Sequence, residues 1–190
     1  MNNLQEQIEG ALEGNFIKEA YPVLVQQGVK DSDVFMHSIG CSIWNTLGHT
    51  LGYMAVVEGP APAGSGDNIR SDSVWFDKGN ITPRVLIEFE RYDGTDRGKA
   101  KLVEKLTNLM EASTRWNSQP DLLVLSTWSS GLVSAPDFSE LAKMFRSGVS
   151  NSKGIRISTP TSCSLLLHRM VFNSDFDDLL RLNHMKFWWS

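Results

Sequence analysis

Residues 83–113, PRVLIEFERYDGTDRGKAKLVEKLTNLMEAS, place a β-prone segment directly before a helical one. In the first part apolar residues alternate with Glu88 and Glu90. Because strand side chains alternate between faces, both carboxylates lie on one face, about 7 Å apart. In the second part Thr95 or Asp96 offers an N-cap, and leucines recur at helical spacing. We therefore expect a strand with two carboxylates on one face, followed by an amphipathic helix.

A buried parallel strand is expected next, within residues 120–131. This segment, PDLLVLSTWSSG, is a continuous apolar run of strand length, which is typical of a strand covered on both faces. Upstream, residues 69–77 and 84–92 flank a glycine-containing turn and predict an antiparallel hairpin. The combination predicts a single α/β domain with a central mixed β-sheet flanked by helices.

The remaining segments extend this domain. Residues 3–28 predict two helical pieces interrupted at Gly14 and Pro22. A helix over about 31–52 is capped by Asp31, Ser32 or Asp33, and its apolar stripe is Phe35, Ile39, Ile43 and Leu47. The other expected segments are a strand at 53–60, a loop at 59–68, a helix at 135–148, strands over 154–172 broken at Pro160, and an amphipathic tail at 175–190. We place the core at about 32–127, N-terminal helices at 1–30, and C-terminal strands and a helix at 128–190.

Composition and charge limit the function. The chain has no apolar run long enough for a membrane span and no signal-like start, so we expect a cytoplasmic protein that does not enter a membrane. Its formal net charge of −4 argues against a nucleic-acid partner, which a basic surplus would favour. Basic residues nevertheless gather in one stretch, where they can form a local patch: Arg84, Arg91, Arg97, Lys99, Lys101 and Lys105.

Several common sites are not predicted. Cys41 and Cys163 show no zinc-site spacing and are interpreted as buried small hydrophobes. No serine-hydrolase elbow and no phosphate-binding P-loop is found. The four histidines are interpreted as residues of helix surfaces or core edges: His37, His49, His168 and His184.

Three acids carry the chemical hypothesis. If the hairpin strands pair, Asp72 lies beside Glu88 and Glu90, and three carboxylates surround one point. Converging carboxylates repel one another unless a cation lies among them or one is protonated. Hard oxygen ligands with room for water suit Mg²⁺ or Mn²⁺, which can polarise a phosphodiester and activate water. The other interpretation is a solvated strand face on which Arg84 or Arg91 pairs with the glutamates.

The order of these elements resembles the restriction-endonuclease-like, PD-(D/E)xK nuclease superfamily over about residues 32–127. The resemblance lies in a helix ending TLGHTLGYMAVVE, an Asp in SDSVWF, the acid-x-acid strand IEFE, the helix KAKLVEKLTNL and the strand LLVLST. It implies that Asp72 and Glu88 hold the metal. No proline precedes Asp72, and Glu90 stands where the superfamily usually has lysine. Glu90 is then a second ligand or the base, or Lys101 or Lys105 of the following helix replaces the lysine.

The resemblance implies a Mg²⁺- or Mn²⁺-dependent endonuclease, with DNA as the expected substrate. Lys101 or Lys105 would stabilise the negative charge that develops on the scissile phosphate. Backbone phosphates would be contacted by Arg84, Arg91, Arg97 and Lys99. A homodimer is expected through the aromatic C-terminal segment that contains Trp188 and Trp189. The alternative is a catalytically inactive protein of the same fold that acts as an interaction or regulatory module.

Overall fold

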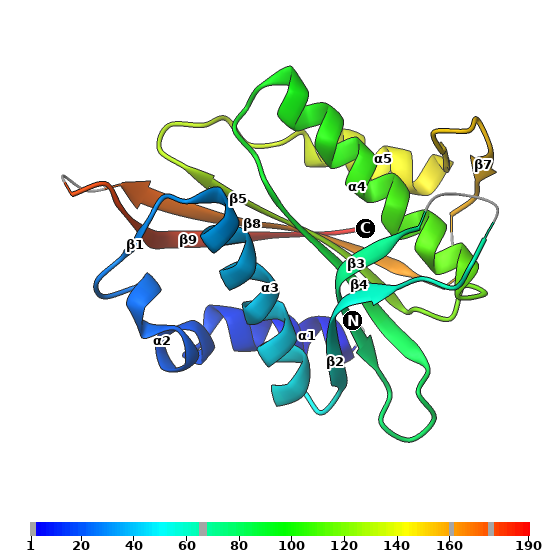
Figure 1. Ribbon diagram of the computed structural model, residues 1–190, viewed down its shortest axis with the longest axis horizontal. Coiled ribbons are helices and arrows are strands. Elements are labelled where there is room, and N and C mark those ends of the chain that lie inside the picture. Colours follow the sequence, from blue (N-terminus) through cyan, green and yellow to red (C-terminus); the bar gives the residue numbers. More distant parts are fainter. Residues whose placement is uncertain (1–2, 65–67, 160–161, 175–176) are drawn as a thin grey trace.

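A computed structural model describes residues 3–64, 68–159, 162–174 and 177–190. Its centre is one twisted seven-stranded sheet with strand order β1-β9-β8-β5-β4-β3-β2 (Figure 1). β4 (Pro83–Arg91), β5 (Leu122–Ser130) and β8 (Ser164–Ser174) run parallel, and the other neighbours are antiparallel. The expected α/β class with a mixed sheet is confirmed.

Helices cover both faces of the sheet (Figure 1). One side carries α1 (Asn3–Glu13), α2 (Phe16–Ala20), the 3-10 turn η1 (Pro22–Leu24) and α3 (Asp33–Thr50). The other carries α4 (Asp96–Arg115) and α5 (Phe138–Ser147). The remaining strands are β1 (Val29–Lys30), β2 (Met54–Pro60), β3 (Arg70–Phe76), β9 (Leu179–Trp189) and a small separate ladder of β6 (Val149–Ser150) with β7 (Arg156–Ile157).

The strand and helix at residues 83–113 form as expected. Val85, Ile87 and Phe89 of β4 pack in the core under α1 and α3, which leaves Glu88 and Glu90 on the face toward α4. Thr95 caps α4, because its hydroxyl oxygen accepts a hydrogen bond from the Gly98 N–H at 3.0 Å. The leucines of α4 are buried against the sheet: Leu102, Leu106 and Leu109. The crossover from β4 through α4 to β5 is parallel, so that prediction is confirmed.

The hairpin opens beside the acids. β3 and β4 pair from Phe76 and Pro83 to Ser73 and Ile87. Asp72 is the residue directly before Ser73 on β3. Beyond this point β4 continues as a partner of β5 alone up to Arg91, so a gap between β3 and β4 opens at Asp72.

Two local expectations need correction, and the structure adds the conformation of the amphipathic tail. Phe35 was expected in the apolar stripe of the third helix but is half exposed, and Met36 and Trp44 are buried instead. Cys41 and Cys163 are both partly exposed rather than buried. The amphipathic tail is a strand, β9, paired with β8 along most of its length. Pro160 and residues 65–67 of the expected loop lie outside the described residues.

The C-terminal segment is tied into the domain. The Trp189 indole N–H donates to the Glu9 carboxylate of α1, and Trp189 packs against the core. Trp188 remains 47% exposed. The homodimer expected through this segment stays a prediction, with Trp188 as the more available side chain.

Candidate functional site

Asp72 is held in place by the backbone of β4. Its Oδ2 accepts a hydrogen bond from the Phe89 N–H at 2.7 Å, in the gap where β3 no longer pairs with β4. Only 6% of Asp72 is exposed. Its carboxylate is therefore fixed against the backbone of β4 at Phe89, the residue between Glu88 and Glu90 in the chain.

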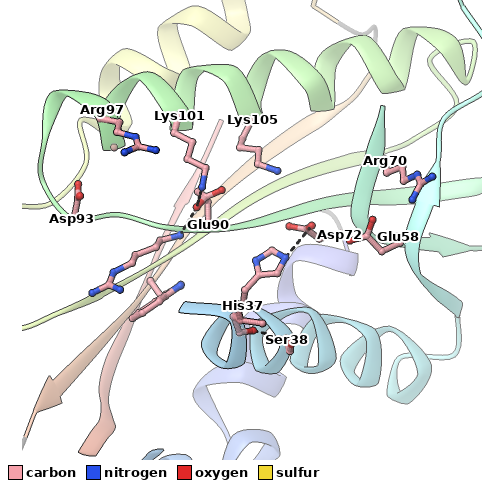
Figure 2. Close-up of a pocket in the computed structure, with 14 residues that line it drawn as sticks. His37, Ser38, Glu58, Arg70, Asp72, Glu90, Asp93, Arg97, Lys101 and Lys105 are labelled. Carbon is pink, nitrogen blue, oxygen red and sulfur yellow. Dashed lines mark hydrogen bonds and ion pairs between the residues drawn. The ribbon is translucent and has the colours of Figure 1, made fainter. Parts of the chain in front are cut away.

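Each glutamate has a lysine partner from α4. Lys105 Nζ lies 2.7 Å from Glu88 Oε2, and Lys101 Nζ lies 2.7 Å from Glu90 Oε1. The lysines are four residues apart and so share a face of the helix. Figure 2 shows both amines pointing from α4 toward the sheet.

Burial and like charge make the site electrostatically unusual. The pKa of Glu88 is raised to about 8, because the carboxyl is buried and the Asp72 charge lies nearby. Burial opposes ionisation of Lys105, yet the attraction of Glu88 dominates and raises the lysine pKa to about 12. Burial also opposes ionisation of Asp72, but hydrogen bonds from His37 and from the Phe89 N–H lower its pKa. Near neutral pH, Asp72 is thus anionic while Glu88 readily keeps a proton.

His37 and Cys41 reach Asp72 from the opposite side. His37 Nε2 lies 3.5 Å from Asp72 Oδ1 and 3.5 Å from Cys41 Sγ. The hydrogen bond to Asp72 is the main reason that the pKa of His37 is raised to about 10. The gap between β3 and β4 lets a residue of α3 approach a carboxylate that otherwise faces α4.

A pocket of about 720 Å³ lies between α3, α4 and the sheet, and its lining includes His37, Asp72, Glu90, Lys101 and Lys105 (Figure 2). Cationic side chains in its lining include Arg70, Arg91, Arg97, Lys101 and Lys105. Acidic side chains in its lining include Glu58, Asp72, Glu90 and Asp93. The pocket therefore combines an anchored carboxylate with several cationic side chains, which nearly balance the acidic ones, in a protein whose net charge is negative.

The predicted phosphate contacts divide into two groups. Arg91 and Arg97 line the pocket. Arg84 lies at the other end of β4, 2.5 Å from Asp121, and Lys99 pairs with the exposed Asp96 at 3.0 Å. Arg84 and Lys99 are therefore absent from the described lining of this pocket.

The glutamates pair with lysines of α4, whereas Arg84 pairs with Asp121. Arg91 pairs with Asp31 at 3.2 Å, and its guanidinium lies 4.8 Å from the centre of the Trp128 ring. Glu88 and Glu90 are also buried, with 1% and 6% of each residue exposed. The glutamates therefore do not form a solvated strand face. Burying two carboxylates is costly unless counter-charges lie close to them, and the two lysines supply those charges.

The carboxylates of Asp72, Glu88 and Glu90 converge less closely than expected. Within the described ranges, three side chains that could bind a metal bring their ligand atoms within 4.8 Å of one another. They are His37, Cys41 and Asp72. Glu88 and Glu90 turn to their lysines instead. The donor set of Asp72, Glu88 and Glu90 still suits a hard divalent cation, because the Asp72 charge raises the pKa of Glu88 and a cation would relieve that repulsion.

Sequence reasoning missed His37 and Cys41 as site residues. One signal was available, because their spacing of four places both side chains on one face of a helix. The spacing could not show that this face meets Asp72, since the approach depends on how α3 crosses the sheet.

Comparison of the chain with protein-family models, with curated proteins and with solved structures gives no match. In the ranges that the structure describes, no helix is both long and apolar enough to cross a membrane. The functional argument therefore rests on the geometry of the pocket.

Proposed function

We propose that the chain is a divalent-metal-dependent nuclease of the restriction-endonuclease-like fold, with DNA as its substrate. The observation that carries the proposal is the placement of Asp72 beside Glu88. The first is anchored by the Phe89 N–H at 2.7 Å, and the second is 1% exposed. Asp72 lines the pocket, and its charge contributes to the raised pKa of the buried Glu88 carboxyl. A carboxyl with a strongly perturbed pKa next to a pocket is a common feature of catalytic sites.

In this proposal Asp72 and Glu88 hold Mg²⁺ or Mn²⁺, and Glu90 is a further ligand or the base. When bound, such a cation polarises the phosphodiester and lowers the pKa of an attacking water. The Phe89 N–H and His37 keep Asp72 ionised and oriented. Glu88 must release its proton to bind a cation, so metal binding is expected to strengthen as the pH rises toward 8.

The lysines have distinct roles in the proposal. With a cation bound to the carboxylates, the amine of Lys105 is released from its 2.7 Å contact with Glu88 and can stabilise negative charge on the phosphate. The Lys101 side chain is 51% exposed, against 22% for Lys105. We therefore assign the inner position to Lys105 and an outer, substrate-facing position to Lys101.

Cleavage of labelled single- and double-stranded DNA and RNA with Mg²⁺ or Mn²⁺ tests the proposal. We expect metal-dependent cutting of DNA that is lost in Asp72→Asn and in Glu88→Gln. Matched controls are Asp96→Asn, at an exposed carboxylate paired with Lys99, and Glu104→Gln, on the same helix as the lysines. Cutting that persists in Asp72→Asn would refute the assignment.

A second candidate is a catalytically inactive interaction module. It is favoured by the lysine pairing, which neutralises Glu88 and Glu90 without a metal. The candidates differ in the melting temperature, because a ligand that binds only the folded state raises it. A nuclease site predicts a rise with Mn²⁺ that Asp72→Asn abolishes, whereas an inactive module predicts no shift.

A further inference from the structure

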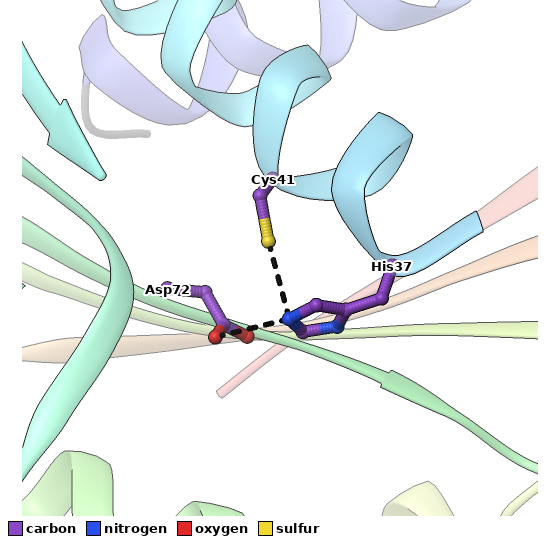
Figure 3. A group of neighbouring side chains, drawn as sticks. All are labelled: His37, Cys41 and Asp72. Carbon is purple, nitrogen blue, oxygen red and sulfur yellow. Dashed lines mark hydrogen bonds and ion pairs between the residues drawn. The ribbon is translucent and has the colours of Figure 1, made fainter. Parts of the chain in front are cut away.

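The contacts of His37 leave its ring nitrogen with two competing partners. Cys41 Sγ and Asp72 Oδ1 both approach the same atom, Nε2, at 3.5 Å (Figure 3). A single N–H cannot point well at both. The separation from Asp72 also exceeds the usual N–H···O range of about 2.7 to 3.2 Å. His37 Nε2 is thus shared between a long contact to Asp72 and a sulfur contact to Cys41, and three metal-ligating atoms face one another.

Two of the three spacings between these ligand atoms fit a tetrahedral cation. Zinc binds sulfur at about 2.3 Å and nitrogen or oxygen at about 2.0 to 2.2 Å, so tetrahedral geometry separates neighbouring ligand atoms by about 3.3 to 3.6 Å. The Sγ to Nε2 and Nε2 to Oδ1 distances are both 3.5 Å. All three ligand atoms lie within 4.8 Å of one another.

The fold holds these ligands before any ion arrives. His37 and Cys41 lie one turn apart on α3, a helix that runs from Asp33 to Thr50. Gly40 brings this turn against β4, because an added Cβ there would lie 2.0 Å from the Phe89 ring. The N–H of the same Phe89 orients Asp72. One close approach, Gly40 on Phe89, therefore sets the positions of ligands from two elements.

We propose that His37, Cys41 and Asp72 form a second cation site, for a thiophilic divalent ion of the Zn²⁺ class. A sulfur ligand disfavours Mg²⁺ and favours Zn²⁺ or Co²⁺. Three protein ligands leave a fourth position open, and His37 and Asp72 both line the pocket. Binding displaces the protons of the thiol and of the imidazolium.

The two cation sites share Asp72, so they compete. An ion held by His37 and Cys41 takes Asp72 from the hard cation of the proposed nuclease and adds positive charge beside it. Zinc is therefore an inhibitor of the Mg²⁺-dependent reaction. The inhibition rests on the proposed function, whereas the site itself does not.

Co²⁺ serves as the probe, because cobalt bound to a thiolate gives a charge-transfer absorption that carboxylate-bound cobalt lacks. We expect the wild type to show this band on titration and Zn²⁺ to remove it. Cys41→Ser should abolish the band, and His37→Gln should weaken Co²⁺ affinity at least about tenfold, since even outer-shell partners are worth about 10- to 100-fold. Cys163→Ser and His49→Gln are the matched controls and should match the wild type.

A double dissociation separates the sites. Glu90→Gln should leave the thiolate band intact and reduce the stabilisation by Mn²⁺, whereas Cys41→Ser should do the reverse. Asp72→Asn should weaken both. Absence of a thiolate band in the wild type, or its persistence in Cys41→Ser, would overturn the second site.

Activity distinguishes this failure from failure of the nuclease. The readout is the ratio of cleavage with Zn²⁺ to cleavage without it, measured for each variant in Mg²⁺, and we expect it to be higher in Cys41→Ser than in the wild type. A thiolate band without cleavage under any condition would support the second site and refute the nuclease. Mg²⁺-dependent cleavage without a thiolate band would support the nuclease and refute the second site. Equal zinc ratios in the two proteins would refute the competition.

Discussion

Lys105 Nζ lies 2.7 Å from Glu88 Oε2, and this contact joins the face of α4 to the most deeply buried carboxylate of the pocket. Glu88 would carry an uncompensated charge without it. The pKa of Glu88 is about 8 even with the lysine present, because burial and the charge of Asp72 outweigh the attraction. Glu88 therefore exchanges its proton near pH 8 while Lys105 remains charged.

Lys105→Met should destabilise the metal-free protein in a pH-dependent way. The folded-state pKa of Glu88 lies above its ordinary value of 4.5, so the stability from its bound proton is full below pH 4.5 and is lost as the pH rises through 8. Without Lys105 the pKa of Glu88 rises further, so at pH 9 the variant keeps a proton that the wild type releases, and we expect an additional loss of about 1.4 kcal/mol relative to pH 6. The loss at pH 6 should be smaller, since Glu88 is already protonated there.

Urea unfolding in the presence of a chelator, at pH 6 and pH 9, measures this difference. Lys99→Met is the control, because its amine pairs with an exposed carboxylate. Equal losses for Lys105→Met at both pH values would contradict the role given to Glu88.

His168 should make the protein acid-sensitive by a separate route. Burial lowers its pKa from 6.5 to about 3. Above pH 6.5 the ring is neutral in both states. Below it the unfolded chain takes up a proton that the folded chain excludes. The free energy of unfolding should fall by about 1.4 kcal/mol per pH unit from 6.5 toward 3.

The difference between wild type and His168→Leu isolates this effect, because other groups titrate in both proteins. The variant should lose stability less steeply between pH 6.5 and pH 4. Parallel stability curves would show that the folded protein admits the proton.

Gly40→Ala should perturb the fold and the pocket together. Its Cβ would lie 2.0 Å from the Phe89 ring, so α3 must move away from β4, at a cost of about 1 to 3 kcal/mol. The matched control is Gly10→Ala in α1, where an added Cβ meets nothing within 4 Å. This substitution should stabilise the helix by about 0.5 to 1 kcal/mol. Thermal melting with and without Mn²⁺ measures both effects, and a neutral Gly40→Ala would argue against close packing at this contact.

Arg97→Ala and Arg84→Ala should differ in their effect on DNA binding. Arg97 lines the pocket, whereas Arg84 is paired with Asp121 at the far end of β4. Removing one phosphate contact should reduce the salt slope of binding by about 1. The variants are compared in an Asp72→Asn background, which prevents cutting. Fluorescence anisotropy at several salt concentrations should show a smaller salt slope for Arg97→Ala and an unchanged salt slope for Arg84→Ala. Equal effects would move the DNA path away from the pocket.

Local patterns predicted the elements that carry the acids. Alternation placed Glu88 and Glu90 on one face, helical spacing placed Lys101 and Lys105 on one side of α4, and Thr95 was among the expected caps. Each of these depends on neighbours within a few residues, so the periodicity of the backbone is sufficient. The tail was harder, because an amphipathic segment can bury its apolar side as a strand or as a helix, and pairing with β8 decides between them.

The sequence by itself determined a mixed α/β sheet, an acid-x-acid strand and the two lysines that follow it, since period and capping are local. Tertiary structure alone decided that β3 separates from β4 at Asp72, that each glutamate receives a lysine, and that His37 and Cys41 reach the same aspartate from the other side. These contacts join residues 11 to 35 positions apart on different elements. Packing of α3 and α4 on opposite faces of the sheet brings them together, and no local pattern encodes that packing.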